Sequence, residues 1–192
     1  PMQMSSFFSA LALGSAALLA AQPAVAQQKL VPAQSEVQFT ARQMGVPLEG
    51  HFKKFDAQVS FDPAKLATSK IVFTVDTGSA TMGSRETDAE LPKATWFNVP
   101  QFPQATFQSS AIKALGAGKF EVTGKLSIKG MARDVVVPVT LVQNGAATMA
   151  TGALPLKRLA FKIGENEWAD TSMVADDVQV KFKLALTGVG KL

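Results

Sequence analysis

The stretch from Phe102 to Val142 constrains the fold more than any other part of the sequence. It contains three segments rich in β-branched and aromatic residues, separated by the turn sequences Gly116-Ala117-Gly118 and Lys129-Gly130. In the middle segment apolar and polar residues alternate, which places them on opposite faces of a strand. Its apolar face consists of Phe120, Val122, Leu126 and Ile128. The stretch therefore predicts an antiparallel meander with one apolar and one hydrated face.

Similar alternation occurs on both sides of this meander. Asn144-Gly145 is a strong signal for a tight hairpin, so the strand that follows it should pair back on the third meander segment. Pro138 lacks an N–H group and therefore indicates a sheet edge or a bulge in that segment. At Lys157-Arg158 the alternation changes phase before Leu159, Phe161 and Ile163, which indicates a bulge or a change of direction. With the meander, eight strands are expected in total, the others near 37–41, 50–61, 71–75, 146–154 and 178–186.

Eight antiparallel strands with one apolar face can form two packed sheets or one barrel, and only the barrel removes the unpaired edges. An eight-stranded barrel is either filled by its own side chains or holds one slender ligand. The chain has 13 Phe and 7 Met but no Tyr, so the interior should be apolar and suited to hydrocarbon. Periodicity alone leaves the filled and the hollow barrel as alternatives.

One short helix is expected between the strands. Residues 84–91 contain helix formers behind Ser84, a good N-cap, and Pro92 interrupts them. Because this helix lacks an apolar stripe, we expect it to lie across an opening or an edge. Trp96 and Phe97 should anchor it, whereas Trp96 and Trp168 either cover the cavity or hold their loops against the barrel.

The N-terminus has the pattern of a secretory signal peptide. Residues 7–21 are almost wholly apolar, and Ala24-Val25-Ala26 supplies the small residues of a cleavage site. The apolar run is shorter than the ~20 residues that a membrane-spanning helix needs. We therefore expect residues 1–26 to be the signal peptide, residues 27–192 to be the mature domain, and the protein to be periplasmic.

Composition argues against several functions. The chain has no Cys and one histidine, His51, so neither a metal site nor a Ser-His-Asp arrangement is favoured, and we expect no enzyme activity and no cofactor. By its parity His51 should face solvent, and Asp176-Asp177 indicates a turn rather than a calcium site. The net charge of +4 is spread along the chain, which argues against nucleic acid as a partner.

Several motifs resemble those of the YceI family, bacterial periplasmic proteins that bind polyisoprenoids in a lipocalin-like barrel. The resemblance extends from about residue 31 to about residue 188, and the run 102–107 is its most specific part. In chain order the motifs are Gly50-x-Phe52-x-x-Phe55, Phe61-Asp62-Pro63, Arg85-Glu86 followed by Trp96-Phe97, Phe102-Pro103-Gln104-Ala105-Thr106-Phe107, Gly124-x-Leu126-x-Ile128-x-Gly130, Pro138-Val139-Thr140-Leu141 and the closing strand from Asp177.

The resemblance implies an all-β fold, an extended antiparallel eight-stranded lipocalin-like barrel with a short helix near one end. It also implies a long isoprenoid or similar amphiphile in the interior and a secretory signal. The residues expected to contact the lipid are Phe39, Phe52, Phe61, Phe73, Val75, Trp96, Phe107, Leu126, Ile128, Val137 and Phe182.

Candidates for a polar head group are Arg85, Lys157 and Arg158, whose charges suit a pyrophosphate or quinone head. The alternative for Arg85 is a surface arginine paired with Glu86 or Glu90, and Lys157 and Arg158 have the same two interpretations, a head-group contact or an ordinary surface residue. The function expected is periplasmic binding, storage or transport of a polyprenyl or quinone-like lipid, and the sequence leaves open transient contact with the inner membrane and a homodimer. The alternative function is a stress-related interaction protein with a filled barrel, and a hydrolase ranks last.

Overall fold

Three consecutive strands confirm the predicted meander. The computed structural model describes residues 28–192, in which β7 (Gln104–Gly116), β8 (Lys119–Ile128) and β9 (Met131–Asn144) pair in antiparallel order. The β8 residues Phe120, Val122 and Ile128 are buried, as their alternation predicts. The turns at Ala117 and Lys129 adopt positive φ, as do the glycines beside them, which explains the turn sequences found there.

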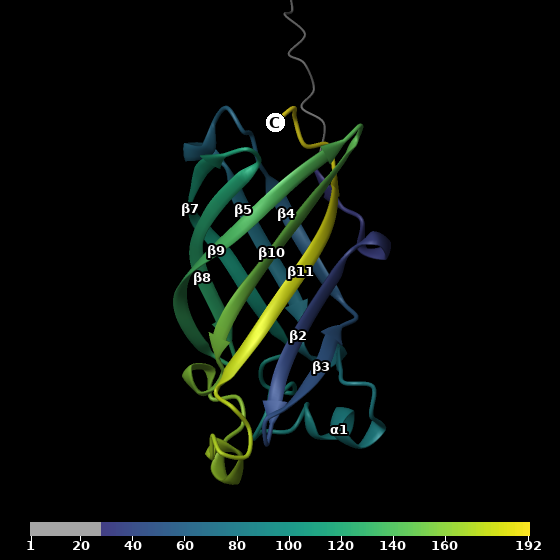
Figure 1. The fold of residues 1–192 in the computed structure, drawn as a ribbon, viewed down its shortest axis with the longest axis vertical. Coiled ribbons are helices and arrows are strands. Elements are labelled where there is room, and N and C mark those ends of the chain that lie inside the picture. The colour runs from purple at the N-terminus through teal and green to yellow at the C-terminus, as the bar shows by residue number, and fades with distance from the viewer. Residues whose placement is uncertain (1–27) are drawn as a thin grey trace, which may run out of the picture.

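The remaining strands continue this sheet on both sides into one antiparallel barrel (Figure 1). The order of neighbours is β4-β5-β7-β8-β9-β10-β11-β2-β3-β6, with β1 on β11. The other strands are β1 (Lys29–Leu30), β2 (Glu36–Gln43), β3 (Val46–Phe52), β4 (Phe55–Ser60), β5 (Lys70–Asp76), β6 (Ala80–Thr81), β10 (Ala147–Lys157) and β11 (Asp177–Thr187). The helical elements are η1 (Pro32–Gln34), η2 (Leu66–Thr68), η3 (Thr77–Ser79), α1 (Arg85–Glu90), η4 (Arg158–Phe161) and η5 (Asn166–Ala169).

The expected count of eight strands differs from the eleven of the sheet for two reasons. The run expected over 50–61 divides into β3 and β4, which pair with β2 and β5 respectively and are the long strands nearest the two ends of the sheet path. β3 and β4 are therefore consecutive strands of the chain, although they lie near opposite ends of the order of neighbours. In addition, β1 and β6 are two-residue strands that the alternation pattern is too short to reveal.

The region around the Asn144-Gly145 hairpin agrees in part with what the sequence predicts. β9 and β10 pair from Asn144↔Ala147 to Val139↔Gly152, as the Asn-Gly signal predicts. Pro138 is the next residue of β9. It pairs with Glu121 of β8 but lies beyond the ladder to β10, so β9 has an edge on that side from Pro138. At Arg158 the chain turns into the 3-10 helix η4, so a change of direction, one of the two outcomes predicted from the change of phase, is confirmed.

Three inward-facing glycines lie under phenylalanine rings of neighbouring strands. A Cβ on Gly50 would collide with the ring of Phe39, and a Cβ on Gly152 would collide with that of Phe182. Gly124 has the same relationship to Phe107. Because glycine has no side chain, each ring can lie close against the wall of the barrel.

The segment between β6 and β7 crosses one end of the barrel, opposite the end where the C-terminus lies (Figure 1). It contains α1, whose N-cap Ser84 accepts a hydrogen bond from the N–H of Thr87, as predicted. No residue of α1 is buried, but Leu91 just after it is. Leu91 and Phe97 form a buried cluster with Ala80, Ile128 and Phe161. We call residues 82–103 the cap segment.

Other expectations concern single residues and the N-terminus. His51 is exposed, as its parity predicts. In residues 28–192 no helix is long and apolar enough to span a membrane, and no group of His, Asp and Glu is arranged to hold a metal ion. The predicted signal peptide, residues 1–26, lies outside the described residues.

Candidate functional site

An apolar cavity of about 220 Å³ lies inside the barrel. On this scale one water molecule needs about 10–15 Å³, so the void is much larger than a packing defect. Every residue that lines it is Ala, Val, Leu, Ile or Phe, except Thr77. The Thr77 hydroxyl donates a hydrogen bond to the carbonyl oxygen of Phe102, at 2.9 Å. The lining therefore offers a guest dispersion contacts and exclusion from water, with its single hydroxyl already engaged.

Most of the residues expected to contact a lipid lie on this cavity, although whether they bind one stays a prediction. They come from β3, β5, β7, β8, β9 and β11 and from the residue that follows β4. The nine that line it are Phe52, Phe61, Phe73, Val75, Phe107, Leu126, Ile128, Val137 and Phe182.

Phe39 and Trp96 do not line the cavity, and each has a different neighbour. The ring of Phe39 covers Gly50 and lies 5.3 Å from the ring of Phe52, centroid to centroid. Trp96 packs against Trp168, with ring centroids 5.7 Å apart. Since neither tryptophan borders the cavity, the pair holds the cap segment against the loop after η4 rather than covering the void.

Sequence reasoning missed other lining residues. Phe120, Leu154 and Leu184 share the inward parity of their strands, so the alternation pattern contained the signal for them. Ile112 has the opposite parity to Phe107 and faces inward only because a β-bulge shifts the register of β7 between Ser109 and Ala111. Phe97 is different, because it belongs to an irregular segment without periodicity. The sequence marked Phe97 as an anchor and gave no sign that it faces the cavity.

The three head-group candidates lie outside the lining of the cavity. Arg85 is exposed at the start of α1. Lys157 forms an exposed ion pair with Asp177, with Nζ and Oδ1 at 2.6 Å, and this hydrogen bond raises the pKa of Lys157. Arg158 is 3% exposed and is fully engaged with the protein itself.

The guanidinium of Arg158 holds the chain together at the end of β10. Its Nε donates to the carbonyl of Ala175, and its two terminal nitrogens donate to four more carbonyls, so all five N–H groups have partners. Those four carbonyls belong to Ile163, Gly164, Trp168 and Val174. Burial lowers the pKa of Arg158. The structure thus gives Arg158 a structural role, which also explains why the chain curls into η4 instead of continuing as a strand.

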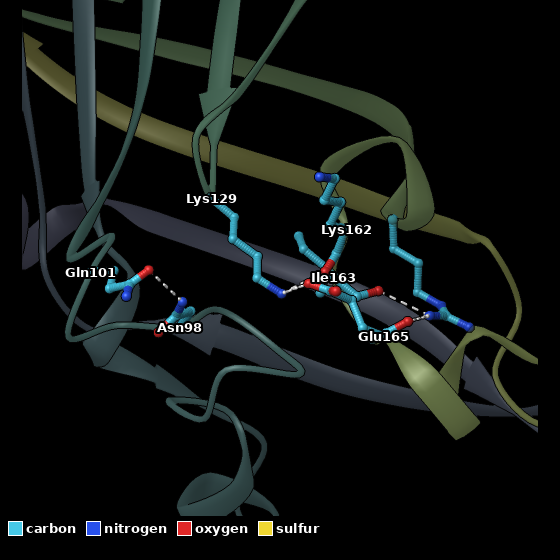
Figure 2. Close-up of polar contacts among 8 residues, drawn as sticks. Asn98, Gln101, Lys129, Lys162, Ile163 and Glu165 are labelled. Atoms are coloured by element: carbon cyan, nitrogen blue, oxygen red, sulfur yellow. Dashed lines mark hydrogen bonds and ion pairs between the residues drawn. The ribbon is translucent and has the colours of Figure 1, made fainter.

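The buried ammonium group of Lys129 connects the turn between β8 and β9 to residues 162–165, which follow η4 (Figure 2). The Nζ of Lys129 donates to the carbonyl of Lys162 at 2.6 Å and to Oε1 of Glu165 at 2.7 Å. The side chain of Lys129 is 4% exposed, whereas that of Glu165 is 44% exposed. The hydrogen bond from Lys129 lowers the pKa of Glu165.

Comparisons with known proteins agree with this architecture. The YceI-like domain matches residues 28–186. A UPF0312 protein of Azotobacter vinelandii is 36% identical over 140 residues, which are 71% of this chain and 72% of that relative.

Solved structures extend the likeness to three dimensions. The crystal structure of Burkholderia cenocepacia BcnA matches with a TM-score of 0.78 and 50% identity, over 81% of this chain and 98% of that one. A polyisoprenoid binding domain from Saccharophagus degradans matches with a TM-score of 0.68 and 14% identity, over 84% and 98% of the two chains. At that identity the second likeness concerns the fold alone.

Proposed function

This chain belongs to the YceI-like domain family, and we propose that it binds a long isoprenoid-type lipid inside its barrel as a periplasmic binding, storage or transport protein. The lipid would be a polyprenyl or quinone-like amphiphile. The observation that carries the proposal is the cavity, whose lining contains apolar side chains and one engaged hydroxyl. Such a lining gives each buried methylene of a guest about 0.8 kcal/mol and gives a polar guest no compensation for lost water.

The shape of the site also supports a chain-like guest. Its lining residues run along β8 from Phe120 to Ile128 and along β11 from Val180 to Leu186, so the void follows the strands. The glycines under the rings of Phe107 and Phe182 keep these rings against the wall. This arrangement favours a hollow barrel over the filled barrel of the alternative interaction protein.

The solved domain from Saccharophagus degradans with the same fold is named a polyisoprenoid binding domain, which supports isoprenoids as the lipid class. The periplasmic location rests on the predicted signal peptide in residues 1–26. A lipid of this class is insoluble in water, so loading or delivery would require transient contact with the inner membrane.

The test is native mass spectrometry of protein purified from its own host without detergent, followed by solvent extraction of the sample. We expect a mass excess that disappears on extraction, and a prenyl lipid in the extract. Protein re-exposed to a polyprenol after extraction should recover the excess. Protein that carries no lipid and takes up no polyprenol would contradict the proposal and would favour the filled-barrel alternative.

A further inference from the structure

One side chain from outside the barrel sheet closes the cavity at the end crossed by the cap segment. Of all the residues in the cap segment, Phe97 alone lines the cavity. It is 9% exposed and belongs to the buried cluster with Leu91 and Phe161. The same cluster includes Ile128, which lines the cavity from the end of β8. The ring of Phe97 therefore stands between the void and the packed cap.

The position of Phe97 is fixed from several sides. Its N–H donates to the carbonyl of Leu91 at 3.0 Å, and its ring lies 6.0 Å from that of Phe52 in an edge-on arrangement. The carbonyl of Thr95 accepts hydrogen bonds from the N–H groups of Gly164 and Glu165, at 2.8 and 2.9 Å. Because Lys129 also binds Glu165, the turn after β8 braces this part of the cap (Figure 2). These contacts hold Phe97 in place against a guest in the cavity.

We propose that Phe97 is the floor of the cavity and sets the longest apolar chain that the barrel accommodates in full. This inference rests on the proposed function. The wall offers no free polar group along its length, so affinity depends on how many carbons of the guest are buried. Each additional methylene raises affinity about fourfold until the chain reaches the floor, and further carbons stay outside or force the chain to fold.

The experiment measures the affinity of the intact mature protein for prenyl alcohols of increasing length, from geraniol and farnesol to long polyprenols, by displacement of a fluorescent apolar dye. The wild type should show a rise in affinity with length that stops at one chain length. In Phe97→Ala the rise should continue to a chain longer by about one isoprene unit, since the change removes about six carbons and the void collapses only in part. Phe97→Leu should give a smaller shift in the same direction.

A substitution with the opposite effect makes the test independent of the stability of Phe97→Ala. Ala105 lines the cavity and packs against the cluster that contains Phe97, so Ala105→Leu should move the break to shorter chains. Ala150 also lines the cavity but pairs with Leu141 and Leu184, away from the cap segment. Ala150→Leu should therefore leave unchanged the chain length at which affinity stops rising. It should lower affinity by a similar factor for all prenyl chains long enough to reach Ala150.

The two proposals fail in different ways. A break that stays at the wild-type length in both Phe97→Leu and Ala105→Leu would overturn the assignment of Phe97 while leaving lipid binding intact. A wild-type protein that binds none of the alcohols would instead contradict the proposed function. Thermal unfolding without lipid identifies any variant that fails to fold, and the remaining variants then decide the result.

Discussion

The Nζ of Lys129 lies 2.7 Å from Oε1 of Glu165, and this contact joins the β8–β9 turn to the loop that supports the cap segment. Lys129 has positive φ in a tight turn, where a lysine side chain usually extends into water. Here it is buried, and its ammonium group also reaches the carbonyl of Lys162. The closed end of the cavity therefore depends on a polar connection as well as on the apolar cluster.

Replacing Lys129 with methionine tests this connection. Lys129→Met keeps the volume of the side chain but loses the hydrogen bonds to the carbonyl and to the carboxylate, so the free energy of unfolding should fall by about 2 kcal/mol. Urea unfolding measures this change. Lys93→Met is the matched control, because Lys93 pairs with Glu90 on the surface at 60% exposure, and its loss should cost less than about 1 kcal/mol. Equal effects of the two substitutions would contradict a special role for Lys129.

The Lys129–Glu165 contact also predicts a dependence of stability on pH. The pKa of Glu165 is lowered in the folded protein, so the pair contributes fully above the ordinary value of about 4.5 and its contribution is lost as pH falls through the folded pKa. The difference in melting temperature between wild type and Glu165→Gln should therefore shrink on acidification. Asp88 and Asp170, whose pKa values are also lowered, are present in both proteins and cancel in this difference. A difference that stays constant from neutral to acidic pH would disprove the pairing.

Arg158 and Lys157 are adjacent, yet the structure predicts a large loss of stability for a substitution of Arg158 and a small one for a substitution of Lys157. Arg158→Lys would leave most of the five carbonyls without their donor, and we expect a loss of at least about 3 kcal/mol of unfolding free energy. Lys157→Ala breaks only an exposed pair and should leave the free energy of unfolding nearly unchanged. Urea unfolding of both variants checks the contrast, and a mild effect of Arg158→Lys would show that the carbonyls find other partners.

This contrast shows where sequence reasoning stops. The change of phase at Lys157-Arg158 was visible in the sequence, and the structure confirms a change of direction there. Both basic residues had equal weight as head-group candidates, because a buried arginine and a surface lysine look alike in a pattern of charges. Which one is buried depends on the carbonyls of the loop 163–175, and these come together only in the folded chain.

The barrel itself was more accessible to prediction. Alternation and turn residues predicted the meander, the Asn144-Gly145 hairpin and the closing strand, because period-two patterns and positive φ are local properties. Of the eleven residues expected to contact the lipid once the resemblance was considered, nine line the cavity. The expectation failed for Phe39, whose inward parity is right but whose ring lies over Gly50 on the next strand. Cross-strand partners depend on register, which single-strand patterns do not contain.

Gly50 itself provides a further test of the wall. Its Cβ position is occupied by the ring of Phe39, so Gly50→Ala must displace that ring, and we expect a loss of about 1–3 kcal/mol of stability. A Cβ on Gly190 would meet no atom within 4 Å, so Gly190→Ala should leave the melting temperature nearly unchanged. The combination Gly50→Ala with Phe39→Leu should recover part of the loss, and an absence of recovery would contradict the steric explanation.

A single pair of tryptophan substitutions tests most directly whether the barrel is a container for a lipid. Leu126 lines the cavity, whereas Leu115 is 51% exposed, so Leu126→Trp fills the void and Leu115→Trp adds the same side chain elsewhere. The measurement is the affinity of each variant for a long polyprenol, with the free energy of unfolding determined in parallel. We predict that Leu126→Trp loses at least about tenfold in affinity with little loss of stability, while Leu115→Trp binds like the wild type. The opposite result is a Leu126→Trp variant that loses about 1–3 kcal/mol of stability, as an already filled core would, and that binds lipid like the wild type. This result would contradict the account.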